Sequence, residues 1–355
     1  MVAILTDKTY ADSLWSKRLF SSLTECLRSR RIPFCQIEDT CPAHCDTVFV
    51  ITSDYAWTSS TVQQLNRSGR SPILLCNQYE NLPGCVYSCV CSDVNTSMKN
   101  LLDSLRQEDR KRVCIFGMNP SSISDISRAN SLFSWKSEDM DTIQMFLNNG
   151  SLAKCFHDFY PRIRDFDAVI CTNDFAAIFL VRILRAQDPQ QLQRLRVVSC
   201  AESELSNFYR EHIETLHVNF QQYGRAAVYI YESLRKRPYL SGMTLYVAPS
   251  FRESSAEAVP TEVTLNPDLQ ADSFYEDPDL QEMLIADHLL NAADQADSII
   301  LAGLATGRSY DEIAESCFLA EGSIKYRIKR LLSESGAGSR EEMIRLYRKY
   351  TRYDP

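Results

Sequence analysis

Six hydroxyl-bearing or cationic side chains lie within eight residues near the end of the sequence. They are Ser323, Lys325, Tyr326, Arg327, Lys329 and Arg330. Apolar residues recur between them at helical spacing, which predicts a helix with an apolar seam opposite a basic ridge. The seam consists of Ile324, Ile328, Leu331 and Leu332. Such a helix can dock on its own domain and present the ridge to phosphates and base edges in a major groove, so it predicts double-stranded DNA as a partner.

A shorter helix is predicted before the ridge, with Ile313 and Ala314 on its buried face and an apolar corner at 317–319. The two helices and their corner resemble a LuxR-type helix-turn-helix. The matching residues are Gly307, Ser309, Glu-Ile-Ala at 312–314, Glu-Gly-Ser-Ile-Lys at 321–325, and Gly336 through Ser339-Arg340. The resemblance implies that the ridge contacts DNA.

Three positions depart from the LuxR-type pattern. Ala320 stands where the family usually has a serine N-cap, which should cost about 1 kcal/mol. Asp311 replaces a residue that is commonly lysine or another polar type, and Glu334-Ser335 replaces Lys-Leu. We expect these departures to affect DNA affinity more than the fold.

The 355 residues are 45% apolar and 24% charged, which is typical of globular protein and long enough for two or three domains. No run approaches the roughly 18 apolar residues of a membrane span. Met1 leads directly into an apolar strand without a signal-peptide pattern, so we expect a cytoplasmic protein without a membrane partner.

Charge is unevenly placed along a chain whose net charge is -8. Residues 253–307 contain twelve acids and no Lys or Arg, whereas 323–352 contain nine Lys or Arg against three acids. A basic segment on an acidic chain favours a nucleic-acid contact at that segment.

The sequence contains 13 cysteines, many of them in apolar strands where a thiol acts as a small buried hydrophobe. The odd count and a reducing compartment argue against a disulfide framework. Cys41, His44 and Cys45 lie close together, but no second pair stands at matching spacing, so a loop is favoured over a zinc site. We expect no metal and no cofactor.

The first 250 residues alternate apolar strands with helices. Strands are predicted at 2–7, 34–38, 47–52, 72–77, 86–93, 112–117, 168–173 and 196–200, and helices at 11–30, 60–67, 95–106, 174–185 and 222–236. This alternation predicts an α/β fold with doubly wound parallel sheets, which bind ligands at the carboxyl ends of their strands.

Part of this region resembles the effector domain of LacI-type regulators, a periplasmic-binding-protein-like fold. The resemblance rests on 167–174, 197–199, 215–220, 224–227 and 245–257, and its best motif is Asn173-Asp174. It implies two lobes with a ligand between them, divided near residue 108 and crossing back near 219–238. We expect this effector-sensing domain to span 1–257. No counterpart of the family's amino-terminal DNA-binding headpiece is found, so the LuxR-type module would replace it.

Residues that follow the strand ends are candidates for binding a small effector, a sugar or related polar ligand. They are Tyr10, Trp15, Asp54, Gln78, Arg128, Asn173, Asp174, Glu202 and Gln222. In the family resemblance, Arg128 and Asp174 correspond to ligand-contacting residues. Two alternatives stay open: Asp174 could cap the helix that follows it, and Trp15 could fill the core. Residues 200–202 differ from the family's usual Phe-Asp-Asp, which leaves open the sugar specificity and whether a small molecule binds.

An acidic linker is predicted at 258–277, followed by a small all-α module at 278–355. Asp277-Pro278 is a strong helix start, with aspartate as the N-cap and proline at the first position. The helix through Leu280 to Leu290 could pair with its copy in a dimer or pack on its own module, and the short apolar run favours the second.

Together these features predict a DNA-binding transcriptional regulator, not an enzyme, that acts as a homodimer and senses a small molecule. Two alternatives remain. Asp54 follows the third strand as a response-regulator phosphoacceptor would, but 250 residues exceed a receiver domain and only Asp7 follows the first strand. An enzyme using the α/β crevice is the other, but no phosphate loop, nucleophile elbow or histidine-centred triad is present.

Overall fold

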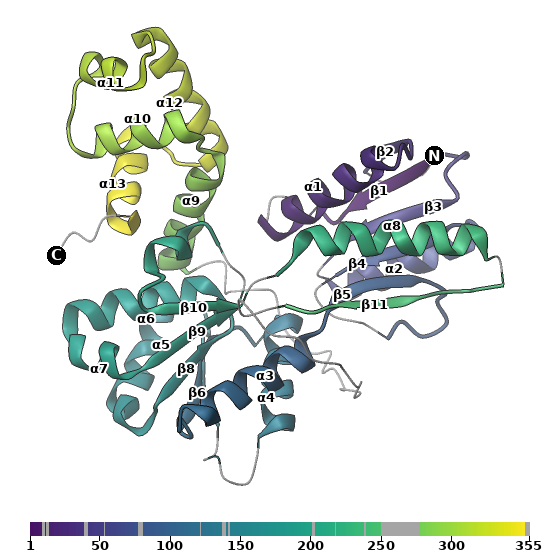
Figure 1. Ribbon diagram of the computed structural model, residues 1–355, viewed down its shortest axis with the longest axis horizontal. Coiled ribbons are helices and arrows are strands. Elements are labelled where there is room, and N and C mark those ends of the chain that lie inside the picture. Colours follow the sequence, from purple (N-terminus) through teal and green to yellow (C-terminus); the bar gives the residue numbers. More distant parts are fainter. Residues whose placement is uncertain are drawn as a thin grey trace. The chain divides into compact units, whose positions relative to one another are not determined.

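A computed structural model of the chain describes residues 1–8, 11, 14–38, 42–52, 54–76, 81–120, 122–136, 140, 143–200, 203–216, 218–237, 239–249 and 277–351. These residues form two compact units (Figure 1). The first unit contains Met1–Ser104, Ile126–Trp135 and the described part of His217–Thr264, and the second contains Leu105–Asp125, Lys136–Leu216 and the described part of Leu265–Pro355.

The first unit is built on a parallel sheet of six described strands in the order β11-β5-β4-β3-β1-β2. The strands are β1 (Val2–Thr6), β2 (Phe34–Ile37), β3 (Thr47–Ile51), β4 (Ser71–Leu75), β5 (Ser88–Ser92) and β11 (Thr244–Val247). Its helices are α1 (Leu14–Ser29), α2 (Tyr55–Arg67) and α8 (Phe220–Lys236), while α3 (Val94–Gln107) and α4 (Ile123–Trp135) contain residues of both units. The central strands are almost wholly buried, as expected for a parallel sheet covered on both faces.

Helices α1 and α8 pack together against this sheet. Gly224 of α8 lies so close to α1 that an added Cβ would be 2.6 Å from the Ser22 carbonyl oxygen. The Ser22 hydroxyl donates a hydrogen bond of 2.7 Å to the Phe220 carbonyl oxygen. The carboxyl-terminal ends of the two helices, at Ser29 and Lys236, therefore belong to one packed layer.

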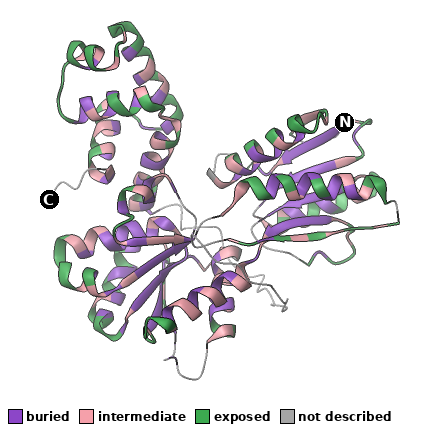
Figure 2. Ribbon diagram, viewed as in Figure 1, coloured by how far each residue is buried: buried purple, intermediate pink, exposed green. Residues whose placement is uncertain are grey.

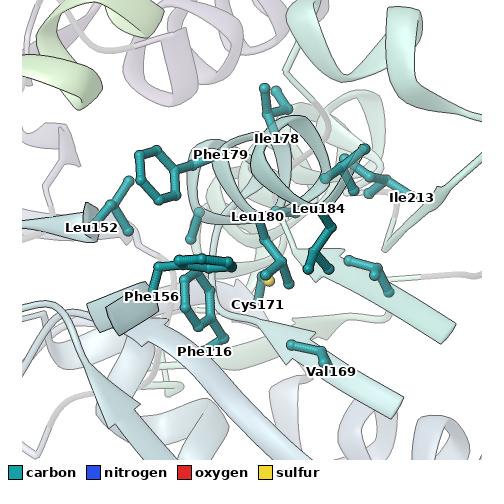
Figure 3. Packing of buried hydrophobic residues seen from close by; sticks show 14 of the residues in the cluster. Phe116, Leu152, Phe156, Val169, Cys171, Ile178, Phe179, Leu180, Leu184 and Ile213 are labelled. Carbon is teal, nitrogen blue, oxygen red and sulfur yellow. The ribbon is translucent and has the colours of Figure 1, made fainter. Parts of the chain in front are cut away.

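The second unit contains a parallel sheet of five described strands in the order β10-β9-β8-β6-β7. They are β6 (Val113–Met118), β7 (Gln144–Leu147), β8 (Ala168–Cys171), β9 (Arg196–Cys200) and β10 (Ile213–Leu216). The connecting helices are α5 (Leu152–Phe159), α6 (Asp174–Gln187) and α7 (Pro189–Arg194), with 3₁₀ helices η1 (Tyr160–Asp165) and η2 (Leu205–Tyr209). Figure 3 shows the apolar face of α6 packed with Phe116, Phe156 and Cys171.

Five helices form the C-terminal module of the second unit. They are α9 (Pro278–Ala292), α10 (Gln295–Ala305), α11 (Tyr310–Cys317), α12 (Glu321–Ser335) and α13 (Arg340–Thr351). The module has its own apolar core. Four residues of α9 and α13 belong instead to the core of the α/β part of this unit, namely Met283, Ala286, Leu346 and Tyr350.

The predicted fold class is confirmed, with parallel α/β sheets in two units and a helical C-terminal region. Most predicted elements are found within a few residues of their expected bounds. The helix expected at 60–67 begins earlier, at Tyr55, because the Asp54 carboxylate accepts a hydrogen bond from the Trp57 backbone N–H. The short strands β7 and β10 were not predicted, since each is only four residues long.

The helix at Asp277-Pro278 begins as predicted, with Asp277 as N-cap and Pro278 in the first turn. Most of the predicted 258–277 linker lies outside the described residues. In the part of the chain that the structure describes, no helix has the length and apolarity to cross a membrane. Its cysteines are free thiols, and Cys45 is buried with its Sγ 4.0 Å from that of Cys35.

Candidate functional site

The predicted helix-turn-helix corresponds to α11 and α12. Helix α11 starts with a capping box: Ser309 Oγ accepts from the Glu312 N–H, and Glu312 Oε2 accepts from the Ser309 N–H at 2.7 Å. It ends at Phe318, which has a left-handed backbone (φ 55°) and a 96% exposed side chain. Ala320 is the N-cap of α12, as predicted, and provides no side-chain hydrogen bond. The expected cost in stability stays a prediction.

The apolar seam of α12 is buried as predicted. Ile324, Ile328 and Leu331 pack in the module core with residues of α10, α11 and α13. Because the seam is fixed in this core, the opposite side of α12 faces outward, and Figure 2 shows exposed residues along it.

Four of the six predicted DNA-contacting residues are exposed on that outward side. They are Ser323, Lys325, Tyr326 and Lys329. The Tyr326 side chain is 71% exposed, and Lys325 forms an ion pair of 2.7 Å with Glu321 one turn earlier. Glu321 raises the pKa of Lys325, because its carboxylate accepts a hydrogen bond from the ammonium group and attracts its charge. We call these four residues the exposed ridge.

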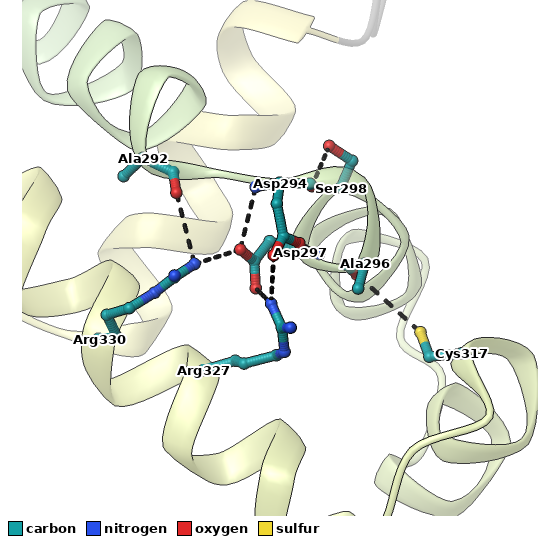
Figure 4. A network of polar contacts seen from close by, with 8 residues as sticks. All are labelled: Ala292, Asp294, Ala296, Asp297, Ser298, Cys317, Arg327 and Arg330. Atoms are coloured by element: carbon teal, nitrogen blue, oxygen red, sulfur yellow. Dashed lines mark hydrogen bonds and ion pairs between the residues drawn. The ribbon is translucent and has the colours of Figure 1, made fainter. Parts of the chain in front are cut away.

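Arg327 and Arg330 have different surroundings, because both contact the start of α10 (Figure 4). Arg327 Nη1 donates to Asp294 Oδ2 at 2.7 Å and to Asp297 Oδ1 at 2.9 Å. Arg330 Nη2 donates to Asp297 Oδ2. Asp297 is fully buried, and its carboxylate also accepts from the Asp294 N–H at 3.0 Å. These two arginines therefore fix the orientation of α12 within the module.

Sequence reasoning did not identify Asp297. The available signal was Asp294 followed three residues later by Asp297, a spacing that fits a capping box, and the structure contains that box. What the sequence did not indicate is that the buried N3 carboxylate also binds two arginines of the predicted recognition helix, which requires the packing of α10 on α12.

Acid should weaken this cluster over a defined pH range. The Arg327 guanidinium and the Asp297 N–H lower the pKa of Asp294 to about 2. A lowered folded-state pKa gives stability that is present above the unfolded value of about 4 and is lost as pH falls toward about 2. We expect Asp294→Asn to lower the unfolding free energy at pH 5 and to match the wild type near pH 2. Denaturant titrations across this pH range measure the unfolding free energy of both proteins. A difference between them that did not change with pH would contradict the assignment. Asp158→Asn, at an exposed carboxylate of α5, is the control.

Two predicted effector residues stand at the end of β8. Asn173 is the N-cap of α6, with Oδ1 accepting from the Ala176 N–H at 2.9 Å, so the alternative that Asp174 is the cap is wrong. Asp174 is 1% exposed and accepts hydrogen bonds from the Ser199 hydroxyl at 2.6 Å and from the Ser203 N–H. Burial raises the pKa of Asp174, against the opposing effect of these donors.

The remaining candidates that the structure describes all belong to the first unit. Asp54 caps α2, and Trp15 is partly buried against the core of the sheet, which agrees with its core alternative. Gln222 is exposed in the first turn of α8, and Arg128 is partly exposed on α4. Tyr10, Gln78 and Glu202 lie outside the described residues. A ligand role for the set stays a prediction.

No protein-family model matches the chain, and no curated protein matches it. Solved structures with the same fold are found at low sequence identity. A LacI family transcriptional regulator, CcpA from Weissella paramesenteroides with bound sucrose, has a TM-score of 0.55 and 16% identity over 71% of this chain and 97% of that chain. The Lac repressor bound to ONPG has a TM-score of 0.57 and 10% identity over 70% and 80%. The regulator CelR in complex with cellobiose has a TM-score of 0.56 and 13% identity over 70% and 82%. The α/β part of the chain thus has the fold of LacI-type effector domains.

Proposed function

We propose that this protein is a transcriptional regulator that binds double-stranded DNA through the exposed ridge of α12. The observation that carries the proposal is a helix whose apolar seam is buried in the module and whose two arginines are paired with aspartates of α10, while its two lysines, a tyrosine and a serine are exposed. Lys325 and Lys329 would bind phosphates or base edges, and Ser323 and Tyr326 would refine the position on the duplex. A homodimer would present two such helices to one DNA site.

We further propose that the α/β domain, which the sequence places at 1–257, senses a small polar effector. The structures with this fold that hold sucrose, cellobiose or lactose are described as transcriptional regulators, which supports a sugar or related ligand. Asn173 and Asp174 stand at the carboxyl end of β8, where sheets of this type bind ligands. The protein would act in the cytoplasm.

The contacts between α9 and the α/β part of the second unit suggest how the effector controls the module. Asp287 of α9 is 2% exposed, and its Oδ1 accepts from the Leu205 N–H at 2.8 Å. Two residues earlier, the Ser203 N–H donates to Asp174. A ligand that changes the surroundings of Asp174 would therefore shift residues 203–205 and the helix bound to them.

Further contacts join the C-terminal module to the α/β part of the second unit. Asp277 Oδ2 accepts from the Leu152 N–H at 2.6 Å, and the Tyr209 hydroxyl donates to the Tyr350 carbonyl oxygen at 3.0 Å. Arg182 lies over the Tyr350 ring at 4.8 Å. Helix α9 also packs on α12, so a movement of residues 203–205 would be transmitted through α9 to the helix that carries the exposed ridge.

Neither the response-regulator alternative nor the enzyme alternative gains support. Asp54 is occupied as the N-cap of α2, which gives this carboxylate a structural role that phosphorylation would disturb. The structural neighbours are transcriptional regulators and not enzymes.

The ridge assignment predicts the salt dependence of DNA binding. We expect Lys325→Ala/Lys329→Ala to weaken binding and to lower the slope of log affinity against log salt by about 0.9 for each phosphate that the variant no longer neutralises. Fluorescence anisotropy of the full chain on a labelled duplex from upstream of its own gene, across a salt titration, measures this. Lys154→Ala, at an exposed lysine of α5, is the control. An unchanged slope in the double variant would refute the assignment.

A further inference from the structure

A pocket of about 480 Å³ opens in the first unit at the amino-terminal edge of its sheet. Its walls are the residue before β1, the turn between α1 and β2, and the last turns of α8. The lining residues are Met1, Arg30, Arg31, Ile32, Pro33, Tyr231, Glu232, Arg235 and Lys236. The carboxyl ends of these strands, where Asp54 follows β3, are at the opposite edge of the same sheet.

The charge of the pocket is strongly one-sided. Four cationic side chains, from Arg30, Arg31, Arg235 and Lys236, face one carboxylate, from Glu232. Glu232 is 4.0 Å from Arg30, a long contact that neutralises at most one cation. Three positive charges thus remain on one small surface of a chain whose net charge is -8.

The remaining cations have no acidic partner among the described residues. Arg235 donates to the Tyr231 hydroxyl at 3.2 Å and lies over the Tyr231 ring. Arg31 and Lys236 make no side-chain hydrogen bond or ion pair within the part of the chain that the structure describes. Their donors are therefore available to a ligand that brings its own negative charge.

Helix ends explain part of this pattern but not all of it. Basic residues in a last helical turn interact favourably with the helix dipole. That effect accounts for Arg235 and Lys236 at the end of α8. Arg31 lies after the end of α1, in a left-handed backbone conformation (φ 55°), and lines the same pocket. The helix dipole therefore does not explain its position, which the turn between α1 and β2 determines.

We propose that this pocket binds a small phosphorylated metabolite with at least two negative charges. Arginine offers planar paired donors that match phosphate oxygens, and lysine adds a point charge. The volume suits a small molecule, and Ile32 and Pro33 supply an apolar wall for its uncharged part. The pocket belongs to the first unit and the DNA-binding ridge to the second, so the two sites share no residue.

The test uses the full chain and pyrophosphate as the probe, measured by isothermal titration calorimetry near pH 7.5 in chloride buffer. We expect saturable binding with a dissociation constant below about 1 mM. Arg31→Gln/Lys236→Gln should weaken it about tenfold or more, because charge-assisted hydrogen bonds to the probe are removed. Neither side chain has a described partner, so the variant should keep the stability of the wild type.

The control Arg67→Gln/Lys154→Gln removes the same charge from exposed positions on α2 and α5, and should change the affinity less than about twofold. No saturable binding, or equal weakening in both double variants, would overturn the proposal. DNA binding by Arg31→Gln/Lys236→Gln should remain that of the wild type, which separates a failure of this site from a failure of the proposed function.

Discussion

Replacing Asp297 with alanine should destabilise the C-terminal module by about 3 kcal/mol, since it leaves Arg330 and the Asp294 N–H without their carboxylate and leaves Arg327 with Asp294 alone. The side chain is fully buried and accepts from Arg327, from Arg330 and from the Asp294 N–H. DNA binding should fall with it, because the interactions that set the orientation of α12 are removed. Denaturant unfolding followed by circular dichroism measures the first effect and anisotropy on duplex DNA the second.

Two further variants make this prediction specific. Asp297→Asn keeps the size and one acceptor oxygen, so its loss of stability should be smaller than that of the alanine variant. Asp158→Asn removes an exposed carboxylate from α5 and should change the unfolding free energy by less than about 0.5 kcal/mol. If Asp297→Ala cost less than about 1 kcal/mol, the cluster in Figure 4 would not be what fixes α12.

Replacing Asp287 with alanine should loosen the packing of α9 on η2. The Leu205 N–H would lose its acceptor at 2.8 Å inside a buried interface, at a cost of about 1–3 kcal/mol. Hydrogen exchange of the Leu205 amide, followed by mass spectrometry or NMR, should accelerate by about fivefold to 150-fold as local opening becomes easier.

The conservative variant separates a coupling role from a general packing defect. Asp287→Asn retains Oδ1 as an acceptor, so the Leu205 amide should stay protected. Amides of strand β3, which belongs to the first unit, should exchange alike in all three proteins. Unchanged exchange at Leu205 in the alanine variant would show that this bond does not hold the interface.

Much of the fold follows from periodicity in the sequence. Uninterrupted apolar runs such as β3 and β6 are typical of parallel strands covered on both faces, and they were correctly predicted. β7 and β10 were missed because tertiary pairing, and not their own pattern, makes them strands. The seam of α12 was also predictable, since its spacing depends only on helix geometry.

The site was predictable only in part. Spacing showed which residues share a face of α12, but it could not separate Lys325 and Lys329 from Arg327 and Arg330. That difference depends on where α10 places Asp297, a residue 30 positions before Arg327 in the sequence. Asp174 is a similar case, because its donors come from Ser199 and Ser203 beyond the next helices. Long-range polar interactions of this kind leave no local periodicity.

The shared core of the second unit limits how this chain can evolve. Met283, Ala286, Leu346 and Tyr350 of the module are buried among side chains of the α/β part. A recombination event that moved the module onto another sensor would leave these residues facing solvent, together with the apolar surface that they cover. Such a hybrid would tend to aggregate. We therefore expect α9 to α13 and the α/β part of the second unit to be inherited together, with the predicted linker at 258–277 a poor boundary for domain exchange.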